Sequence, residues 1–311
     1  MARASLPGIG NKEFRLFFMS VCNVLLVCLG LSLALVLFGL APALGLPSSL
    51  CIFLAALAAP LQWALVHESI HNHLAPTPVA NRRLGRLIGW TLGYSWDVVR
   101  FGHLMHHRFN RHELDRPEQW KEGQSWLGAA GPYYLQLLGG HAMLSVAAAP
   151  ILALAPRLAL RMTPQVGEAG RRMKIAASGY FIRPVRRRRI LADLAMIFAL
   201  AALALWAWRI HPLILLAILV ARFAILSLLD NMAHYATAVD GSFAGQNMSA
   251  PRLLRWLLLN QNFHGLHHRN PALRWFELAD DFRAGGESYS CEWLAALLAQ
   301  LKGPTELSPE N

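Results

Sequence analysis

Two long apolar stretches organise the chain. From Leu16 to His67 there is no Asp, Glu, Lys or Arg, and this run is about twice the roughly 20 residues that one membrane-spanning helix needs. The segment APALGLPSS, residues 41–49, divides the run, because Pro and Gly favour a turn between two spans. The pattern therefore predicts a helical hairpin with spans at about residues 16–40 and 48–67.

The second stretch runs from about Ile190 to Leu229 and is broken at Arg209–Pro212. Trp206 and Trp208 stand just before the break, and aromatic side chains of this kind favour a membrane interface. The stretch predicts a second hairpin, with spans at about residues 190–208 and 212–230.

Composition supports a membrane protein. The 311 residues are 55% hydrophobic and only 15% charged, and the mean hydropathy is +0.35, which is too apolar for an ordinary soluble domain of this size. We expect a single all-α membrane domain over residues 1–311, with four transmembrane helices in two hairpins and a cytosolic helical cap. Neither the charge nor any motif indicates a nucleic-acid partner.

The distribution of basic residues predicts the orientation. Of the 29 Lys and Arg residues, 18 lie between Asn72 and Arg189, whereas the two predicted outer loops hold only Arg209. Because short cytoplasmic loops retain Lys and Arg, both hairpins should open toward the cytoplasm. We therefore expect residues 72–189 and 235–311 to be cytosolic or interfacial, and both termini to be cytoplasmic. The run RRRR at 186–189 is interpreted as a positive anchor on that side.

A fifth apolar stretch, from Pro132 to Pro156, is long enough to be considered as a span. We expect it not to cross the membrane. An odd number of crossings would put two histidine clusters of identical spacing on opposite sides of the membrane, and these clusters look like parts of one site.

The histidines fall into short, regular groups at the predicted membrane exits. The second span ends in LVHESIH, and two later segments, HLMHH at 103–107 and HGLHH at 264–268, repeat one spacing. Residues three and four apart share a helical face, so each group gathers its imidazoles on one side of a helix. The fourth span ends in LLDNMAHY, which adds one carboxylate and one more histidine. The candidate metal ligands are His67, His71, His103, His106, His107, His234, His264, His267, His268 and Asp230.

Nine histidines and one carboxylate exceed the four ligands of a tetrahedral zinc site and suit two metal ions. Nitrogen and oxygen ligands with open positions favour iron that must bind and reduce oxygen, so we expect two iron ions. The four cysteines form no C-x-x-C pair, and three of them fall inside predicted spans, so a thiolate site is not indicated.

The segments HESIH, HLMHH and HGLHH resemble the three histidine boxes of the integral-membrane fatty acid desaturase and hydroxylase superfamily. The resemblance covers roughly residues 15–285 in box order, spacing and flanking spans. It implies a cytosol-facing di-iron site, formed by the nine histidines above, that uses molecular oxygen and two electrons to attack a C–H bond of a lipid. In acyl desaturases an Asn-x-x-x-His pair precedes the third box, whereas here Asp230 stands four residues before His234. Asn231, three residues before His234, is an alternative.

Within that superfamily we expect fatty acyl desaturation. Fatty acid hydroxylation, decarboxylation to a terminal alkene and carotenoid oxidation remain alternatives, and the carrier of the acyl chain stays open. The sequence has no Gly-x-Gly-x-x-Gly fingerprint, cysteine cluster or His-Pro-Gly-Gly motif, so electrons should come from an external donor such as ferredoxin or a b-type cytochrome. A zinc peptidase, suggested by H-E-x-x-H, and a metal transporter are remote alternatives because both leave most of the histidines unexplained.

Several polar residues outside these motifs are secondary candidates. A carboxylate often orients a metal-bound imidazole, and four carboxylates lie within reach of the first two boxes, although ordinary salt bridges explain them equally well. These are Glu68, Asp97, Asp115 and Glu118. Asn260 could support the third box or cap a helix, and Arg222 inside the fourth span needs a partner. The isolated His141 and His211 are interpreted as packing or interface residues.

Overall fold

The computed structural model describes residues 11–120, 123–163, 166–239 and 244–306. Within these residues the chain is predominantly helical. Its strands form two small parallel pairs, β1 (Gln119–Trp120) with β4 (Thr305–Glu306) and β2 (Met248–Ser249) with β3 (Cys291–Glu292). The all-α prediction is therefore confirmed, and the strands serve only to tie distant loops together.

The first apolar stretch forms the predicted hairpin. Helix α1 (Asn11–Leu35) continues through a π-helical turn, η1 (Val36–Leu40), and the chain turns before α2 (Ser48–Ile70). Pro47 caps α2 from an extended conformation, and Gly45 has a positive φ of 64°. The turn lies where the sequence predicted it, because Pro fixes φ at the start of a helix and Gly tolerates a left-handed backbone conformation.

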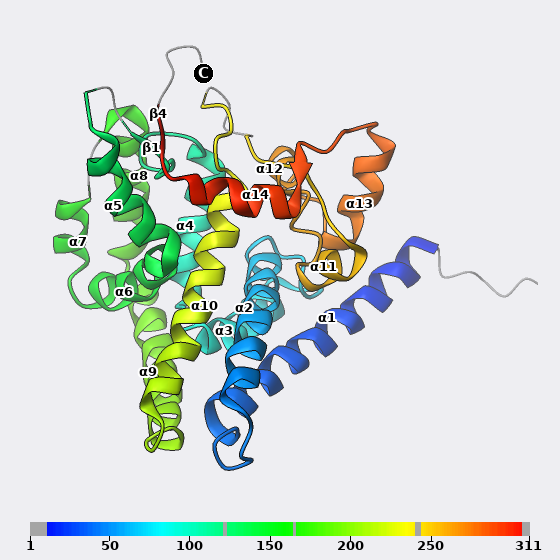
Figure 1. Cartoon of the computed structure of the whole chain (residues 1–311), viewed down its shortest axis with the longest axis vertical. Helices are drawn as coiled ribbons and strands as arrows, with labels where there is room; N and C mark the ends of the chain where they lie inside the picture. Colours follow the sequence, from blue (N-terminus) through cyan, green and yellow to red (C-terminus); the bar gives the residue numbers. More distant parts are fainter. Residues whose placement is uncertain (1–10, 121–122, 164–165, 240–243, 307–311) are drawn as a thin grey trace, which may run out of the picture.

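The second apolar stretch also forms a hairpin, made of α9 (Pro184–Ala207) and α10 (Pro212–Met232). Figure 1 shows the turns of both hairpins at the same end of the molecule, while α12, α13 and α14 lie toward the opposite end. The Trp208 indole donates to the carbonyl of Leu37 at 3.0 Å, and Leu215 and Ile218 pack with Cys51 in a shared core. The two hairpins are thereby joined near their tips.

The fifth apolar stretch is one helical segment with an internal break. It comprises α5 (Trp126–Leu135), a π-helical turn η2 (Gln136–Gly140) and α6 (His141–Leu154). Leu138 and Gly139 leave the helical conformation, and Gly139 has φ of 125°. By length and composition, five helices of the described chain are able to cross a membrane: Phe18–Leu40, Ser48–Ile70, Trp126–Leu154, Pro184–Ala207 and Pro212–Met232. The four predicted spans are all present as helices, and the broken segment is a fifth candidate.

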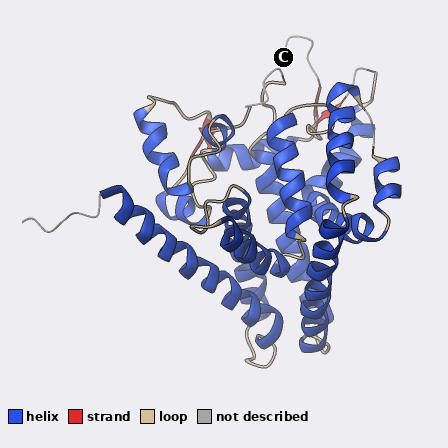
Figure 2. Cartoon of the chain, turned by 180° about the vertical axis from the view of Figure 1, so that it is seen from behind, coloured by secondary structure: helices blue, strands red, loops and turns tan. Residues whose placement is uncertain are grey.

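The remaining helices connect the hairpins and cover the end from which the histidines project. After α2 come α3 (Pro78–Thr91) and α4 (Trp96–Phe109), and between the broken segment and α9 lie α7 (Pro156–Met162) and α8 (Gly167–Phe181). The last part of the chain forms α11 (Arg252–Leu257), α12 (His264–Arg269), α13 (Trp275–Ala284), α14 (Trp293–Ala299) and the 3₁₀ turn η3 (Gln300–Lys302). Seen from behind in Figure 2, α1 leans away from the helical body toward the N-terminus.

A buried ion-pair network fixes α4 against α3 and α9. The carboxylates of Asp97 and Asp193 are fully buried, and the Arg86 guanidinium contacts both. Arg186 adds a second contact to Asp97 at 2.5 Å, and the Ser95 hydroxyl donates to Asp193 at 2.7 Å. Removing one partner from such a network leaves an uncompensated buried charge, at a cost of about 3–5 kcal/mol. Asp97 thus holds the helix of the second histidine box in place and does not contact a histidine.

Candidate metal centre

Four segments carry the predicted histidines to one place. His67 and His71 lie at the end of α2, His103, His106 and His107 on the last two turns of α4, His234 just after α10, and His264, His267 and His268 on α12. The short helix α12 is positioned by close backbone packing. A Cβ atom on Gly265, the second letter of HGLHH, would lie 2.4 Å from the carbonyl oxygen of Gly245. Only glycine permits this approach, and the Leu266 N–H then donates to the Asn247 side chain at 2.9 Å.

The nine histidines form two groups. The nitrogen atoms of each group lie within 4.8 Å of one another. The five-histidine group consists of His67, His71, His103, His107 and His267, and the four-histidine group consists of His106, His234, His264 and His268. No carboxylate or cysteine belongs to either group among the described residues.

The repeated His-x-x-His-His spacing now has a structural explanation. In HLMHH the i and i+4 histidines join the five-histidine group, and the central His106 joins the four-histidine group. In HGLHH the i and i+4 histidines join the four-histidine group, and His267 joins the five-histidine group. Each motif gives two side chains to one group and one to the other, in opposite senses. The spacing therefore builds two adjacent sites from two short helices.

The Nε2 atoms within each group converge closely. His71 and His103 are 2.9 Å apart at Nε2, and His103 and His107 are 3.0 Å apart. In the other group the Nε2 atoms of His234 and His264 are 2.8 Å apart. A neutral imidazole has one donor and one acceptor nitrogen, so such a cluster cannot satisfy all its lone pairs by itself. The Nε2 of His67 is buried with no hydrogen-bond partner in the described chain, and a cation at the centre of each group fits these donors.

Burial keeps most of these side chains in the neutral form that binds metal. Desolvation, with repulsion from neighbouring histidines and Arg100, lowers the pKa of His71 to about 3, and burial together with His106 lowers the pKa of His107 to about 4. The pKa of His103, His234, His264, His267 and His268 is also lowered, by burial and then by nearby histidines. His106 differs: burial lowers its pKa, but the charges of Asp115 and Asp230 and the hydrogen bond to Asp115 together raise it overall. A metal ligand must offer a lone pair, so this environment favours metal over protons.

The outer ring nitrogens have partners that orient the rings. Asp115 Oδ2 accepts from His106 Nδ1 at 2.8 Å, and the carbonyl of Ala244 accepts from His234 Nδ1 at 3.0 Å. The Gln261 amide contacts His67 Nδ1 at 3.0 Å. The contacts of Asp115 and Ala244 choose the tautomer that leaves Nε2 of His106 and His234 free to bind a metal, and the Gln261 contact holds the His67 ring in place. Of the carboxylates considered from sequence, Asp115 thus contacts a box histidine directly.

The other secondary candidates make different contacts, and Asn260 contacts no histidine among the described residues. Glu68 is buried with Oε1 3.5 Å from His67 Nδ1, and Glu118 pairs with the buried Arg111. Asn260 donates to the carbonyl of Trp275 at 2.8 Å and supports the loop, not a histidine. Gln261 and Ala244 were missed by the sequence reasoning, because nothing in their residue type or spacing marks them.

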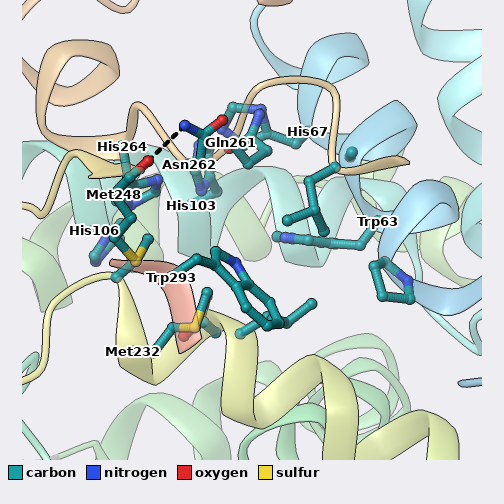
Figure 3. A pocket seen from close by; sticks show the side chains of 16 residues that line it. Trp63, His67, His103, His106, Met232, Met248, Gln261, Asn262, His264 and Trp293 are labelled. Carbon is teal, nitrogen blue, oxygen red and sulfur yellow. Dashed lines mark hydrogen bonds between the residues drawn. The ribbon is translucent and has the colours of Figure 1, made fainter. Parts of the chain in front are cut away.

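An apolar pocket opens onto both histidine groups. Its wall includes His67 and His103 of one group and His106 and His264 of the other. Figure 3 shows Trp63, Met232, Met248 and Trp293 around the same space, with the Asn262 side chain donating to the Met248 carbonyl at 2.7 Å. The pairing of β2 with β3 brings Trp293, the first residue of α14, beneath the histidines. The site therefore joins two candidate metal positions to a cavity suited to hydrocarbon.

Comparison with known proteins agrees with this arrangement. A family model described as fatty acid desaturase matches residues 44–289, which contain all three histidine boxes and most of the chain. The chain belongs to the fatty acid desaturase family. No curated protein matches the sequence.

Membership of the desaturase family makes the chain a membrane oxidoreductase and gives the two histidine groups their chemical context. Iron is the metal typical of the family, and the all-nitrogen donor sets described above fit it. The apolar helices and the family together indicate a membrane protein.

Asp230, the one carboxylate among the candidate ligands predicted from the sequence, lies outside both histidine groups. Its Oδ2 is 3.3 Å from His141 Nε2, and its side chain is 46% exposed, although it also lines the apolar pocket. The neighbouring Asn231 donates to Gln300 at 2.9 Å and to the Tyr133 hydroxyl at 3.3 Å. Neither residue contacts a histidine of the two groups. His141, which the sequence analysis interpreted as a packing residue, contacts Asp230 beside the site.

Proposed function

We propose that this protein is an oxygen-dependent di-iron fatty acyl desaturase that introduces a double bond into the acyl chain of a lipid. The observation that carries the proposal is the convergence of nine histidines into two adjacent groups that share one apolar pocket. Two iron ions bound by these groups would supply the redox chemistry that activates molecular oxygen. The five-histidine group and the four-histidine group are the proposed ligands, and Asp230 is assigned no direct bond to iron.

The protein side chains have separable tasks in this proposal. Asp115, Gln261 and the Ala244 carbonyl orient individual imidazoles. Trp63 and Trp293, with the apolar side chains around them, hold the hydrocarbon and exclude water from the reacting carbons. The apolar pocket and both histidine groups are built from α2, α4, the end of α10 and α12, so we treat residues 1–311 as one functional unit.

The electron balance requires a partner. Removal of two hydrogens from an acyl chain, with reduction of oxygen to two waters, consumes two electrons and two protons from outside. The sequence contains no motif for a flavin, nicotinamide, iron–sulfur or haem group. We therefore propose an external electron donor such as ferredoxin or a b-type cytochrome, which approaches the cytoplasmic face.

The proposed topology has four membrane spans and places both histidine groups on the cytoplasmic side. His107 and His267 lie on opposite sides of the broken segment in the sequence, yet their Nε2 atoms are 3.1 Å apart. An odd number of crossings between them is incompatible with this contact, which supports α9 and α10 as crossing helices and the broken segment as a non-crossing one. The concentration of Lys and Arg in residues 72–189 supports the cytoplasmic assignment. The two termini, also expected in the cytoplasm, lie outside the described residues.

The proposal is tested by comparing His267→Ala with His112→Ala. His267 is buried in the five-histidine group, whereas His112 is an exposed histidine next to the second box that belongs to neither group. Cells expressing the native protein and His112→Ala should accumulate a new unsaturated fatty acid, measured by gas chromatography with mass spectrometry of hydrolysed lipids. His267→Ala should lose it while still inserting into the membrane, and should lose iron measured by elemental analysis.

The same measurement separates the alternatives. A hydroxy acid in the hydrolysed lipids, or a terminal alkene in the headspace, would retain the iron site and replace the desaturation. Full activity of His267→Ala would remove that residue from the ligands. Zinc in place of iron, with no oxidised lipid when reduced ferredoxin is added, would contradict the proposed chemistry altogether.

A further inference from the structure

A second, smaller pocket adjoins the apolar one. Its wall contains Trp63, Tyr94, His141, Ser145 and Asp230. Trp63 and Asp230 line the apolar pocket as well, so the two spaces meet at these two side chains. We call the second space the polar pocket.

The break in the fifth apolar segment builds this pocket. At Gly139 the backbone takes φ of 125°, and a Cβ there would lie 3.3 Å from the Phe223 Cβ on α10. This close approach brings the start of α6 onto α10, where the N–H of Ala142 donates to the Ser227 hydroxyl at 3.2 Å. His141 is thereby placed against Asp230, three residues after Ser227 on the same helix.

The pair of His141 and Asp230 calls for an explanation other than metal binding. Asp230 lies in the last turn of α10, a helix apolar enough to span a membrane, where ionisable side chains are expensive and usually functional, and His141 begins α6 beside it. Neither belongs to a histidine group. Within the described chain, His141 is the ion-pair partner of Asp230, and it engages one of the two carboxylate oxygens. The remaining oxygen is available to a ligand.

The polar groups of the pocket favour one kind of ligand. A carboxylate only accepts hydrogen bonds, the Tyr94 hydroxyl can donate or accept, and the Ser145 hydroxyl, which donates to the His141 carbonyl at 3.4 Å, can accept. A hydroxyl group on the ligand can therefore donate to Asp230 and still find a donor nearby. A plain methylene would bury these groups without a hydrogen bond, and a free carboxylate would meet the charge of Asp230.

We propose that the polar pocket binds a hydroxyl group carried within the acyl chain of the lipid substrate, while neighbouring carbons of that chain lie in the apolar pocket beside the histidines. This inference rests on the proposed function only in taking an acyl lipid as the ligand. It makes hydroxylated acyl chains the preferred substrate class, and it gives the carboxylate at position 230 a role in substrate selection.

Equilibrium binding tests the inference without turnover. The purified full-length, iron-loaded protein in detergent is titrated with stearic acid and with a series of monohydroxystearic acids that differ in hydroxyl position. Binding is followed by the change in tryptophan fluorescence, to which Trp63 and Trp293 of the apolar pocket contribute. In the native protein at least one hydroxy isomer should bind about tenfold more tightly than stearic acid, because the new hydrogen bond has a charged acceptor. Equal affinity for stearic acid and every isomer would overturn the inference.

Two variants locate the preference. Asp230→Leu should bring the affinity ratio between the best hydroxy isomer and stearic acid to about one, since it removes the acceptor. Asp230→Asn keeps the shape and one acceptor oxygen, and should lower the ratio about threefold, because a neutral acceptor binds more weakly. Asp281→Asn, which changes an exposed carboxylate on α13 that lines neither pocket, should keep the native ratio. An unchanged ratio in the folded Asp230 variants would refute the assignment.

The binding assay needs neither reductant nor oxygen, so it separates this inference from the proposed function. A clear hydroxyl preference in a protein that forms no oxidised lipid would leave the inference standing and remove the desaturase. Desaturation of ordinary acyl chains without any hydroxyl preference would do the reverse. Preference for 1-stearoylglycerol alone would place the hydroxyl on a headgroup and overturn the in-chain assignment.

Discussion

Replacing Asp115 by Ala should weaken metal binding at the four-histidine group and spare the five-histidine group. Asp115 Oδ2 lies 2.8 Å from His106 Nδ1, on the side of the ring opposite the converging Nε2 atoms. The contact fixes the orientation of the ring and increases its basicity as a ligand. Among the described residues, Asp115 contacts no histidine of the five-histidine group. The effect should therefore be confined to one metal.

The expected size follows from the exposure of the pair. Loss of a group that orients a metal-bound histidine weakens metal binding by about 10- to 100-fold, which corresponds to about 1.4–2.7 kcal/mol. The side chains of His106 and Asp115 are 21% and 25% exposed, so water partly replaces the lost carboxylate. We therefore expect the lower end of this range, a loss of about tenfold in affinity.

The assay is a chelator titration of the purified iron-loaded protein at about pH 8, where protons compete little with metal for imidazoles. Native protein should lose its iron in one range of chelator concentration. Asp115→Ala should release about half of its iron at roughly tenfold lower chelator concentration and the rest in the native range. Glu168→Gln, which changes an exposed carboxylate paired with Arg171 and Arg172 on α8, is the matched control. Release of both irons together, at native chelator concentrations, would refute the reasoning.

Two further predictions concern stability. Gly139→Ala forces an L side chain into φ of 125° against Phe223 and should lower the free energy of unfolding by about 1–3 kcal/mol, seen as a lower thermal midpoint. Gly131→Ala on α5, where a Cβ meets nothing within 4 Å, should not lower it, and equal destabilisation of the two variants would exclude the strain. The metal-free protein should lose stability as pH falls from 6.5 toward about 4, because burial lowers the pKa of His71 to about 3 and of His73 to about 4, so the unfolded chain binds more protons there. A thermal midpoint that stays constant or rises over this range would contradict that linkage.

Much of the architecture is readable from local pattern. An apolar segment long enough to span a bilayer forms a helix, because lipid offers no hydrogen-bond partner to free backbone groups. Pro47 and Pro212 mark the starts of two of these helices because Pro fixes φ. The spacing of HLMHH and HGLHH likewise places three imidazoles on one helical face. The ligand candidates could therefore be named without coordinates, and eight of them fall within three short motifs.

Residues outside those motifs could not be assigned in this way. Asp97 and Asp115 have the same side chain and both flank the second box, yet one is held by arginines of α3 and α9 and the other by His106. Gln261 reaches His67 across almost 200 positions, as the sequence separation of 194 shows. Such pairings depend on how helices pack, and no local spacing encodes them.

The sequence by itself determined the helical hairpins, the candidate ligands and the family resemblance, since each depends on residues within one or two helical turns. Only the tertiary structure decided how the nine histidines divide, because His106 and His107 are adjacent in the chain but point into different groups. It also left Asp230 outside both histidine groups and placed His141 beside it, through a break at Gly139 that the hydrophobic pattern does not reveal. The physical reason is the same in each case: helical geometry is local, whereas the distance between two helices is set by everything packed between them.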